Sequence, residues 1–282
     1  MNEQQRKGEN EMGRTIGICN HKGGVGKTTT AVTMARCLTD LGYRVLLVDL
    51  DDSGNPSLSK NLGVEAKVEE GETNLIDVLD PILKGRPLNK KILHDSIVEH
   101  KEGYYVLPSD KSLSGLSLSI ISSVAKDKTT ILKKALEPLK ALFDYIILDA
   151  APSLTLLQTN LMASCDDVII VTQPQGASVD GIAEMIETLS AVKTQISPDL
   201  RMAGVLIVMY DGRTNYNKDK TAIIVEQLRE QGVPVFNTVI PRSVVAESWV
   251  EAHASLIEYK PNSKPSKAYQ EFVKEYLELE RR

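Results

Sequence analysis

A glycine-rich segment between a short apolar run and a helical pattern constrains the fold of this chain more than any other feature. The segment reads Asn20-His21-Lys22-Gly23-Gly24-Val25-Gly26-Lys27-Thr28. Glycines let successive backbone N–H groups point into one concavity, and the N-terminus of the following helix adds its positive dipole end. We expect a phosphate-binding loop in which Lys27 reaches the β- and γ-phosphates and the Thr28 hydroxyl ligates Mg²⁺.

The loop departs from the commonest phosphate-loop pattern, GxxxxGK[ST], in two ways. His21 stands where the first glycine should be, and a second lysine, Lys22, is followed at once by two glycines. The alternative is a glycine-rich turn that binds nothing. The strand before the segment, the helix after it and the Lys-Thr pair all favour phosphate binding instead.

Short β-branched runs alternate with longer helical patterns along the rest of the chain. Strands are predicted at 15–19, 45–48, 104–107, 145–148, 168–172, 204–209 and 235–239, and helices over 28–41, 117–142, 178–194 and 221–231. Several of the strands are apolar throughout, as expected where helices cover both faces of a sheet. The order predicts an α/β fold with a doubly wound, mostly parallel sheet and helices on both faces.

Three further parts of the chain complete this organisation. Gly42 follows the first predicted helix and is expected to end it in a left-handed conformation. Residues 60–103 are rich in Lys and Glu and predict short helices and loops beside the sheet. Residues 1–12 are polar and predict a disordered arm, which leaves residues 13–282 as one domain.

Three aspartates stand at the carboxyl ends of predicted strands, where ligands of α/β proteins bind. Asp49 and Asp51 follow the apolar run Val45-Leu46-Leu47-Val48, and Asp149 follows Tyr145-Ile146-Ile147-Leu148. Four apolar residues that deliver one aspartate form the Walker B pattern, so Asp149 is expected to hold Mg²⁺ directly or through water. The alternative for Asp49 and Asp51 is a local one, in which they cap the next element.

Composition narrows the class of protein. The 282 residues carry a net charge of −5, so any contact with DNA must come from a local basic patch. Three separated cysteines suggest neither a disulfide framework nor a metal site, which fits a reducing cytoplasm. No apolar stretch reaches the roughly 18 residues that span a bilayer, and the first twelve residues lack the apolar core of a signal peptide.

The run Lys-Gly-Gly-Val-Gly-Lys-Thr, with Asp51 following Lys27 in the next strand, resembles the signature of the ParA/MinD family of deviant Walker ATPases, which are P-loop NTPases. The resemblance implies ATP and Mg²⁺ as ligands. It implies that Lys22 reaches across a dimer interface to the partner's nucleotide, that Asp51 orients or activates the attacking water, and that Asp49 lies near Mg²⁺. The implied nucleotide contacts are Lys22, Gly23, Gly24, Val25, Gly26, Lys27, Thr28 and Thr29.

The distal half carries two more blocks that look like this family, Met209-Tyr210-Asp211-Gly212-Arg213-Thr214-Asn215 and Thr238-Val239-Ile240-Pro241-Arg242. In partition ATPases and their Soj-like relatives the second block lies against adenine, so Pro241 is a candidate base contact. Arg213 and Arg242 correspond to arginines implicated in non-specific DNA binding by the dimer. Val245 replaces a second arginine of the family, and Trp249 is expected in the core or at a partner contact.

The resemblance points to a ParA/Soj-like partition ATPase that dimerises on ATP binding and binds DNA without sequence preference. Its partner would be a ParB/Spo0J-like centromere-binding protein that stimulates a slow hydrolysis, and the protein would be cytoplasmic and nucleoid-associated. The alternative is a MinD-like or other ParA-related positioning ATPase that acts on a membrane or a protein cluster. A MinD-like protein would carry a basic amphipathic C-terminal helix, whereas the acidic tail from Gln270 to Glu280 is expected to pack on the core. A non-enzymatic ATP clamp remains a further alternative.

Overall fold

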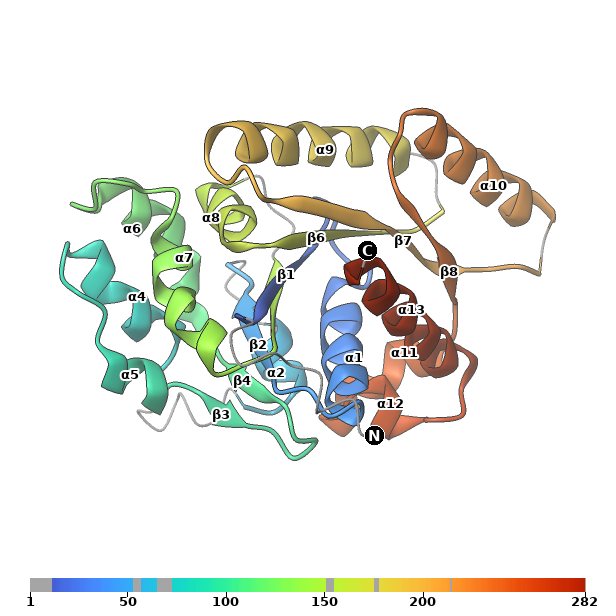
Figure 1. Cartoon of the computed structure of the whole chain (residues 1–282). Coiled ribbons are helices and arrows are strands. Elements are labelled where there is room, and N and C mark those ends of the chain that lie inside the picture. The colour runs from blue at the N-terminus through green and yellow to red at the C-terminus, as the bar shows by residue number, and fades with distance from the viewer. Residues whose placement is uncertain are drawn as a thin grey trace.

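One twisted sheet organises the chain. The computed structural model describes residues 12–52, 57–64, 73–150, 155–174, 178–213 and 215–281. Within them, eight strands pair in the order β3-β4-β2-β5-β1-β6-β7-β8 (Figure 1). The strands are β1 Arg14–Cys19, β2 Val45–Leu50, β3 Val98–Glu99, β4 Tyr105–Leu107, β5 Tyr145–Ala150, β6 Asp167–Thr172, β7 Arg201–Tyr210 and β8 Val235–Pro241.

The pairing confirms the predicted α/β class. Every neighbouring pair is parallel except β3 with β4, which is antiparallel at the edge of the sheet. The sequence analysis missed β3, because two residues are too few to show a period of two. The predicted arm at residues 1–12 lies outside the described residues except for Met12, so it stays a prediction.

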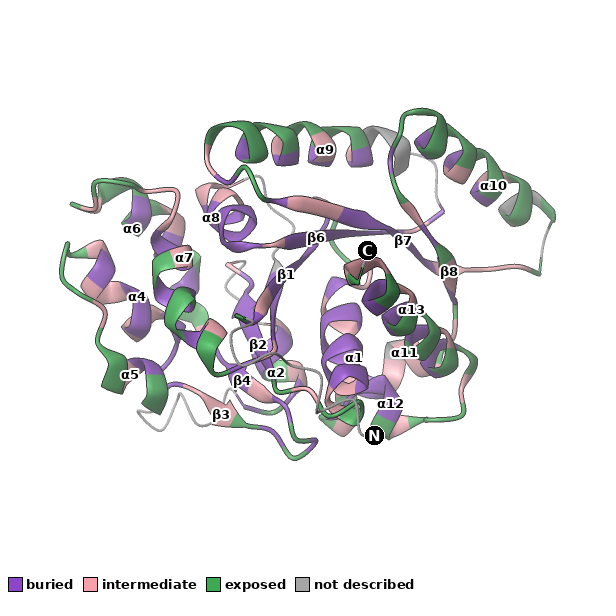
Figure 2. Ribbon diagram, in the orientation of Figure 1, coloured by how far each residue is buried: buried purple, intermediate pink, exposed green. Residues whose placement is uncertain are grey.

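Helices cover both faces of the sheet, as predicted (Figure 1). One face carries α1 Lys27–Asp40, α2 Ser57–Asn61, α12 Leu256–Tyr259 and α13 Lys264–Glu280, with α11 Val245–Ser248 and the 3-10 turn η4 Trp249–Ala252 between them. The other carries α4 Leu75–Leu83, α5 Lys90–Asp95, α6 Leu116–Ser122, α7 Ile131–Leu136, α8 Leu156–Ser164, α9 Ser178–Gln195 and α10 Asn215–Glu230, with the 3-10 turns η2 Lys111–Gly115 and η3 Glu137–Ala141. The buried residues form two clusters, one on each face, and the outer sides of α9 and α10 are exposed (Figure 2).

The prediction of one helical stretch over 117–142 was wrong, because α6 and α7 are separate and η3 follows. Asp127 explains the first break: its side chain accepts hydrogen bonds from the Thr129 backbone N–H at 2.9 Å and the Thr129 hydroxyl at 2.7 Å. Such local bonds compete with a helix backbone. Pro138, which lacks a backbone N–H, lies in the 3-10 turn that ends the segment.

Two other local predictions are confirmed. Gly42 follows α1 with a φ of 89°, a conformation that favours glycine, and its N–H donates to the Thr39 carbonyl at 2.9 Å. Trp249 is buried, and its indole N–H donates to the Thr29 hydroxyl at 3.3 Å, so it belongs to the core. The indole therefore supports the first turn of α1 from beneath the glycine-rich loop.

The C-terminal helix α13 packs on the core, as predicted, and a buried carboxylate holds its end. Asp167, at the start of β6, accepts hydrogen bonds from Arg14 Nε at 2.6 Å, Arg201 Nε at 2.6 Å and the Tyr276 hydroxyl at 2.8 Å. Burial alone would raise the pKa of Asp167, but these bonds outweigh burial and hold the pKa below its usual range. We call these four residues the Asp167 cluster. It lies at the opposite end of the strands from the glycine-rich loop.

Removing the Tyr276 hydroxyl should destabilise the fold measurably. Tyr276→Phe is expected to lower the free energy of unfolding by about 1.5–3 kcal/mol, the usual range for a hydrogen bond to a charged group. Urea titration at pH 7 measures the difference. The contribution of Asp167 should persist above roughly pH 4 and disappear as the pH falls through its lowered pKa.

Tyr259→Phe on α12 is the matched control, because no hydrogen bond from its hydroxyl is found within the described residues. Equal unfolding midpoints for Tyr276→Phe and wild type would contradict the role of the Asp167 cluster in holding α13.

Candidate nucleotide-binding site

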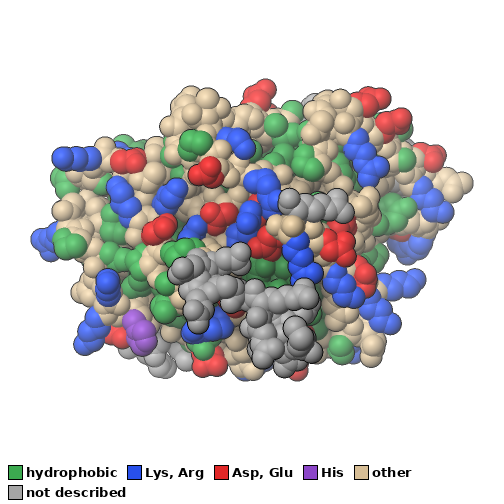
Figure 3. All heavy atoms as spheres, in the orientation of Figure 1, with side chains coloured by type: hydrophobic (Ala, Val, Ile, Leu, Met, Phe, Trp, Pro, Cys, Tyr) green, Lys and Arg blue, Asp and Glu red, His purple; other side chains and the backbone are tan. Residues whose placement is uncertain are grey.

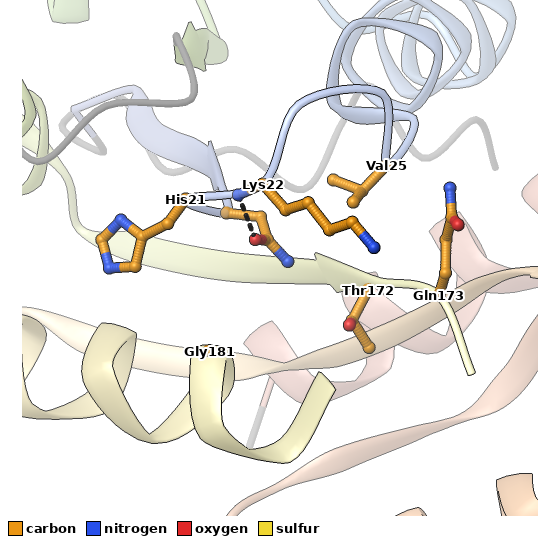
Figure 4. Close-up of a pocket in the computed structure, with 7 residues that line it drawn as sticks. His21, Lys22, Val25, Thr172, Gln173 and Gly181 are labelled. Atoms are coloured by element: carbon orange, nitrogen blue, oxygen red, sulfur yellow. Dashed lines mark hydrogen bonds between the residues drawn. The ribbon is translucent and has the colours of Figure 1, made fainter. Parts of the chain in front are cut away.

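The glycine-rich loop leaves β1 and turns into α1 at the carboxyl edge of the sheet. The buried Asn20 fixes its start: Nδ2 donates to the Val171 carbonyl at 2.7 Å, and Oδ1 accepts from the Lys22 backbone N–H at 2.8 Å. Figure 4 shows the second bond as a dashed line. Gly24 and Gly26 have φ values of 69° and 88°, where a side chain would be strained. Asn20 and the two glycines therefore give the loop its shape.

Lys27 is the first residue of α1, and its side chain is buried at the centre of the site. Its ammonium group donates to the Lys22 carbonyl at 3.1 Å, and the residue is only 6% exposed. Burial lowers the pKa of Lys27, while Asp149 and Asp51 act in the opposite direction. Within the described part of the chain no side chain caps the N-terminus of α1 at Gly26, so backbone N–H groups there are open to an anion.

Asp149 and Asp49 lie side by side, because they are partners in the register of β5 and β2. Asp149 is 1% exposed, and neither carboxylate oxygen has a hydrogen-bond partner of normal geometry among the described residues. Burial raises the pKa of Asp149, and the Thr28 hydroxyl acts in the opposite direction. A buried carboxylate with open oxygens beside a threonine hydroxyl is the donor set that Mg²⁺ prefers.

Asp49 is bonded quite differently. Its Oδ2 accepts from the Ser59 hydroxyl at 2.6 Å and the Ser59 backbone N–H at 2.8 Å, and its Oδ1 accepts from the Asp51 backbone N–H at 3.1 Å. Burial raises its pKa to about 6, against the effect of these bonds. Asp49 therefore ties β2 to α2, and its predicted place near Mg²⁺ stays a prediction.

Asp51 lies near Lys27 and Asp149. It follows β2, is 8% exposed, and its charge acts on both Lys27 and Asp149. The structure thus brings together Lys27, Thr28, Asp51 and Asp149, as the sequence predicted. The segments just beyond the two strand ends include residues 53–56 and 151–154, which lie outside the described residues.

The predicted base contact, Pro241, lies in a hollow beside the loop. Residues of the loop and α1, Gly26 and Thr29, form one wall, and the ends of β7 and β8 form the other with Met209 and Pro241. Pro241 pairs with Tyr210 in the sheet register. The hollow therefore joins the phosphate-binding loop to the two distal blocks that were singled out in the sequence.

Arg213 and Arg242 both lie next to Asp211, beyond the ends of β7 and β8. Arg213 donates to Asp211 through Nε at 2.8 Å and Nη2 at 2.6 Å, and its side chain is 85% exposed. Hydrogen bonds from Arg213 lower the pKa of Asp211 to about 2, and Arg242 acts in the same direction. The two predicted DNA-binding arginines are therefore neighbours at one end of the sheet.

Four residues of this site had no role in the sequence analysis. Asn20 was the most accessible to prediction, since it directly precedes the loop. Ser59, Gln173 and Met209 come from other elements, and their contacts with the site depend on how the chain packs.

The contact between Ser59 and Asp49 can be tested by deletion of one hydroxyl. Ser59 is fully buried, and its hydroxyl donates to Asp49 and accepts from the Ser109 backbone N–H at 3.0 Å. Ser59→Ala is expected to lower the free energy of unfolding by about 2–3 kcal/mol, because it leaves a buried N–H unpaired and weakens a charge-assisted bond.

Ser57→Ala on the same helix is the control for this experiment. Among the described residues the Ser57 hydroxyl makes a single 3.3 Å contact, with the Thr28 hydroxyl, so we expect a loss of at most about 1 kcal/mol. Chemical denaturation of the two variants measures both values, and equal losses would contradict the assignment of Asp49.

Known proteins resemble this chain over nearly its whole length. A family model described as an AAA domain matches residues 13–202. Sporulation initiation inhibitor protein Soj of Bacillus subtilis is 34% identical over 94% of this chain and 98% of its own length. Chromosome-partitioning ATPase Soj of Thermus thermophilus is 36% identical over 94% and 95%.

The fold agrees with this likeness. The structure of cobyrinic acid a,c-diamide synthase from Mycobacterium smegmatis with bound ATP analogue and magnesium superposes with a TM-score of 0.74, at 30% identity over 93% of each chain. The family model, the relatives and the fold lead to the same assignment. The chain belongs to the ParA/Soj-like family of partition ATPases.

Proposed function

We propose that this protein hydrolyses ATP, dimerises when ATP binds, attaches to DNA without sequence preference and segregates a plasmid or chromosome with a ParB-like partner. The observation that carries the proposal is the pair of lysines around the loop. Lys27 is buried among Asp149 and Asp51, whereas Lys22 is exposed at the mouth of the site. We infer that Lys27 would contact the protein's own nucleotide and that the exposed Lys22 would reach the nucleotide of a second copy.

ATP binding follows from the chemistry of the loop and the hollow. The triphosphate would lie on the loop N–H groups and the N-terminus of α1, with Lys27 against the β- and γ-phosphates, and the base would lie over the small hollow beside Pro241. Thr28 and Asp149 would hold Mg²⁺ between them. When bound, the ion would neutralise charge that develops on the phosphate oxygens.

Hydrolysis needs a positioned water and a further positive charge. Asp51 is buried beside Lys27 and Asp149, where its carboxylate can orient a water toward the γ-phosphate. Lys22 of a second copy would offset the negative charge of the transition state, as an arginine finger does. Because that lysine arrives only in the dimer, hydrolysis and dimerisation are coupled.

Substitutions of the two lysines should have different effects. Lys27→Ala is expected to abolish ATP binding, since it removes the buried cation of the loop. Lys22→Ala should still bind ATP but should lose most of the dimerisation and turnover. Fluorescent-nucleotide titration measures binding, and light scattering with phosphate release measures the other two. Tight ATP binding by Lys27→Ala would overturn the site assignment.

DNA binding would use Arg213 and Arg242 at the end of the sheet. On the face shown in Figure 3, lysine and arginine side chains are interspersed with acidic ones, so this view presents no broad positive area. A dimer would present two such pairs of arginines, one from each subunit. A few phosphate contacts of this kind give DNA affinity that is sensitive to salt and independent of sequence. Arg213 pairs with Asp211 in the free protein and would exchange this carboxylate for a DNA phosphate.

Arg242→Glu should weaken binding to random duplex DNA only in the presence of ATP. The slope of log affinity against log salt should become shallower by about 1–2 for the dimer, since each subunit loses a phosphate contact. Lys91→Glu on α5, which makes the same charge change at an exposed position away from this end of the sheet, is the control. An unchanged salt slope for Arg242→Glu would place the DNA surface elsewhere.

The proposed switch can be tested by comparing DNA binding with ATP, with ADP and without nucleotide. Purified protein should bind random DNA with ATP but not with ADP or without nucleotide, and DNA with a ParB/Spo0J-like partner should accelerate phosphate release. Such a protein would be cytoplasmic and nucleoid-associated. No helix in the described residues is long and apolar enough to cross a membrane, and the apolar side of α13 is buried. DNA binding that ignores the nucleotide would contradict the switch.

A further inference from the structure

Gln173 connects two parts of the site that come from different strands. It directly follows β6 and stands across the pocket from Lys22 (Figure 4). Its side-chain Nε2 donates to the Gly24 carbonyl at 2.9 Å and lies 2.8 Å from Met209 Sδ. Both neighbours are acceptors, so the nitrogen of the amide, and not its oxygen, faces them. Each N–H of one amide therefore has its own partner.

The bond to Gly24 bears directly on the shape of the phosphate-binding loop. A loop that cradles phosphate must point its N–H groups inward and its carbonyls outward, because carbonyl oxygens repel phosphate oxygens. Gly24 has a φ of 69°, and an added Cβ there would meet nothing within 4 Å. The hydrogen bond from Gln173 to its carbonyl restrains the orientation of this peptide.

Met209 supplies the other end of the connection. Its φ of 54° is unusual for a residue with a side chain, and among the described non-glycine residues only His253 shares a positive φ. From this position the Met209 side chain approaches the loop: its Cε lies 3.6 Å from where a Cβ of Gly26 would stand. Met209 also lines the hollow beside Pro241.

We propose that Gln173 is a positioning residue that joins the Gly24 carbonyl to Met209, so that the phosphate-binding loop and the base hollow hold a nucleotide as one unit. This inference rests on the proposed binding of ATP at this site. Gln173 acts through the loop and touches no reacting atom. It therefore governs the affinity for nucleoside di- and triphosphates alike.

The test uses Gln173→Leu, which keeps the size of the side chain and removes both N–H groups. The dissociation constants of fluorescent ADP and ATP should each rise about 3- to 10-fold, as expected for the loss of one or two modest hydrogen bonds. The midpoint of urea unfolding should stay at the wild-type value, so that the loss of affinity reflects the loop and not the stability of the fold. Gln195→Leu, at the exposed end of α9, is the matched control and should change none of these values.

A double-mutant cycle tests whether the two contacts act together. Met209→Leu removes the sulfur acceptor and should also weaken nucleotide binding. If Gln173 joins the loop to Met209, the double variant should lose less affinity than the sum of the two single losses, because either substitution already breaks the connection. Fully additive losses would contradict the connection.

The outcomes separate this inference from the function on which it rests. Absence of ATP binding by wild-type protein would overturn the proposed function itself. Wild-type binding with an unchanged dissociation constant in Gln173→Leu would overturn only the role of Gln173. A fall in turnover at saturating ATP without a change in affinity would also overturn it, because that result assigns Gln173 to the chemical step.

Discussion

The buried carboxylate of Asp149, held beside the ammonium group of Lys27, is the constraint on which the rest of the site depends. The two groups lie at the end of parallel strands, where no side chain of the described residues caps the N-terminus of α1. Burial is unfavourable for each charge alone, and each favours the charged form of the other. The open oxygens of Asp149 remain ready for a cation, and the open N–H groups for an anion. A metal-bound polyphosphate satisfies both.

The surrounding structure keeps these charged groups in place. Asp49 is the in-register neighbour of Asp149, yet its oxygens are taken by Ser59 and the backbone of Asp51. The two adjacent aspartates therefore differ in role. Asp49 holds α2 to the sheet, whereas the oxygens of Asp149 have no hydrogen-bond partner of normal geometry among the described residues. At the far ends of the strands the Asp167 cluster holds α13, whose Tyr269 hydroxyl in turn meets Thr30 of α1 at 2.9 Å. The first turn of the helix that carries Lys27 is therefore packed against α13.

The described structure also shows how a nucleotide could influence distant surfaces. The hollow beside the loop is shared by α1 and by the ends of β7 and β8, and the chain continues from those ends to Arg213 and Arg242. A base that enters this hollow would contact the strands that carry the proposed DNA-binding arginines. In the free protein Arg213 is occupied by Asp211. In the proposed function, competition between Asp211 and a DNA phosphate would make the DNA affinity sensitive to small shifts at this end of the sheet.

The sequence by itself determined the α/β class, seven of the eight strands and the core of the nucleotide site. Those features depend on local chemistry: buried parallel strands are apolar throughout, and a phosphate loop needs glycines, a lysine and a threonine in consecutive positions. The sequence did not reveal the two-residue strand β3, the break at Asp127 or the partners of Asp49. Only the tertiary structure decided that Trp249 lies beneath Thr29 and that Gln173, 149 residues from Gly24 in the chain, bonds to its carbonyl. Contacts between residues so far apart depend on the order and register of the strands, which no local pattern of residues records.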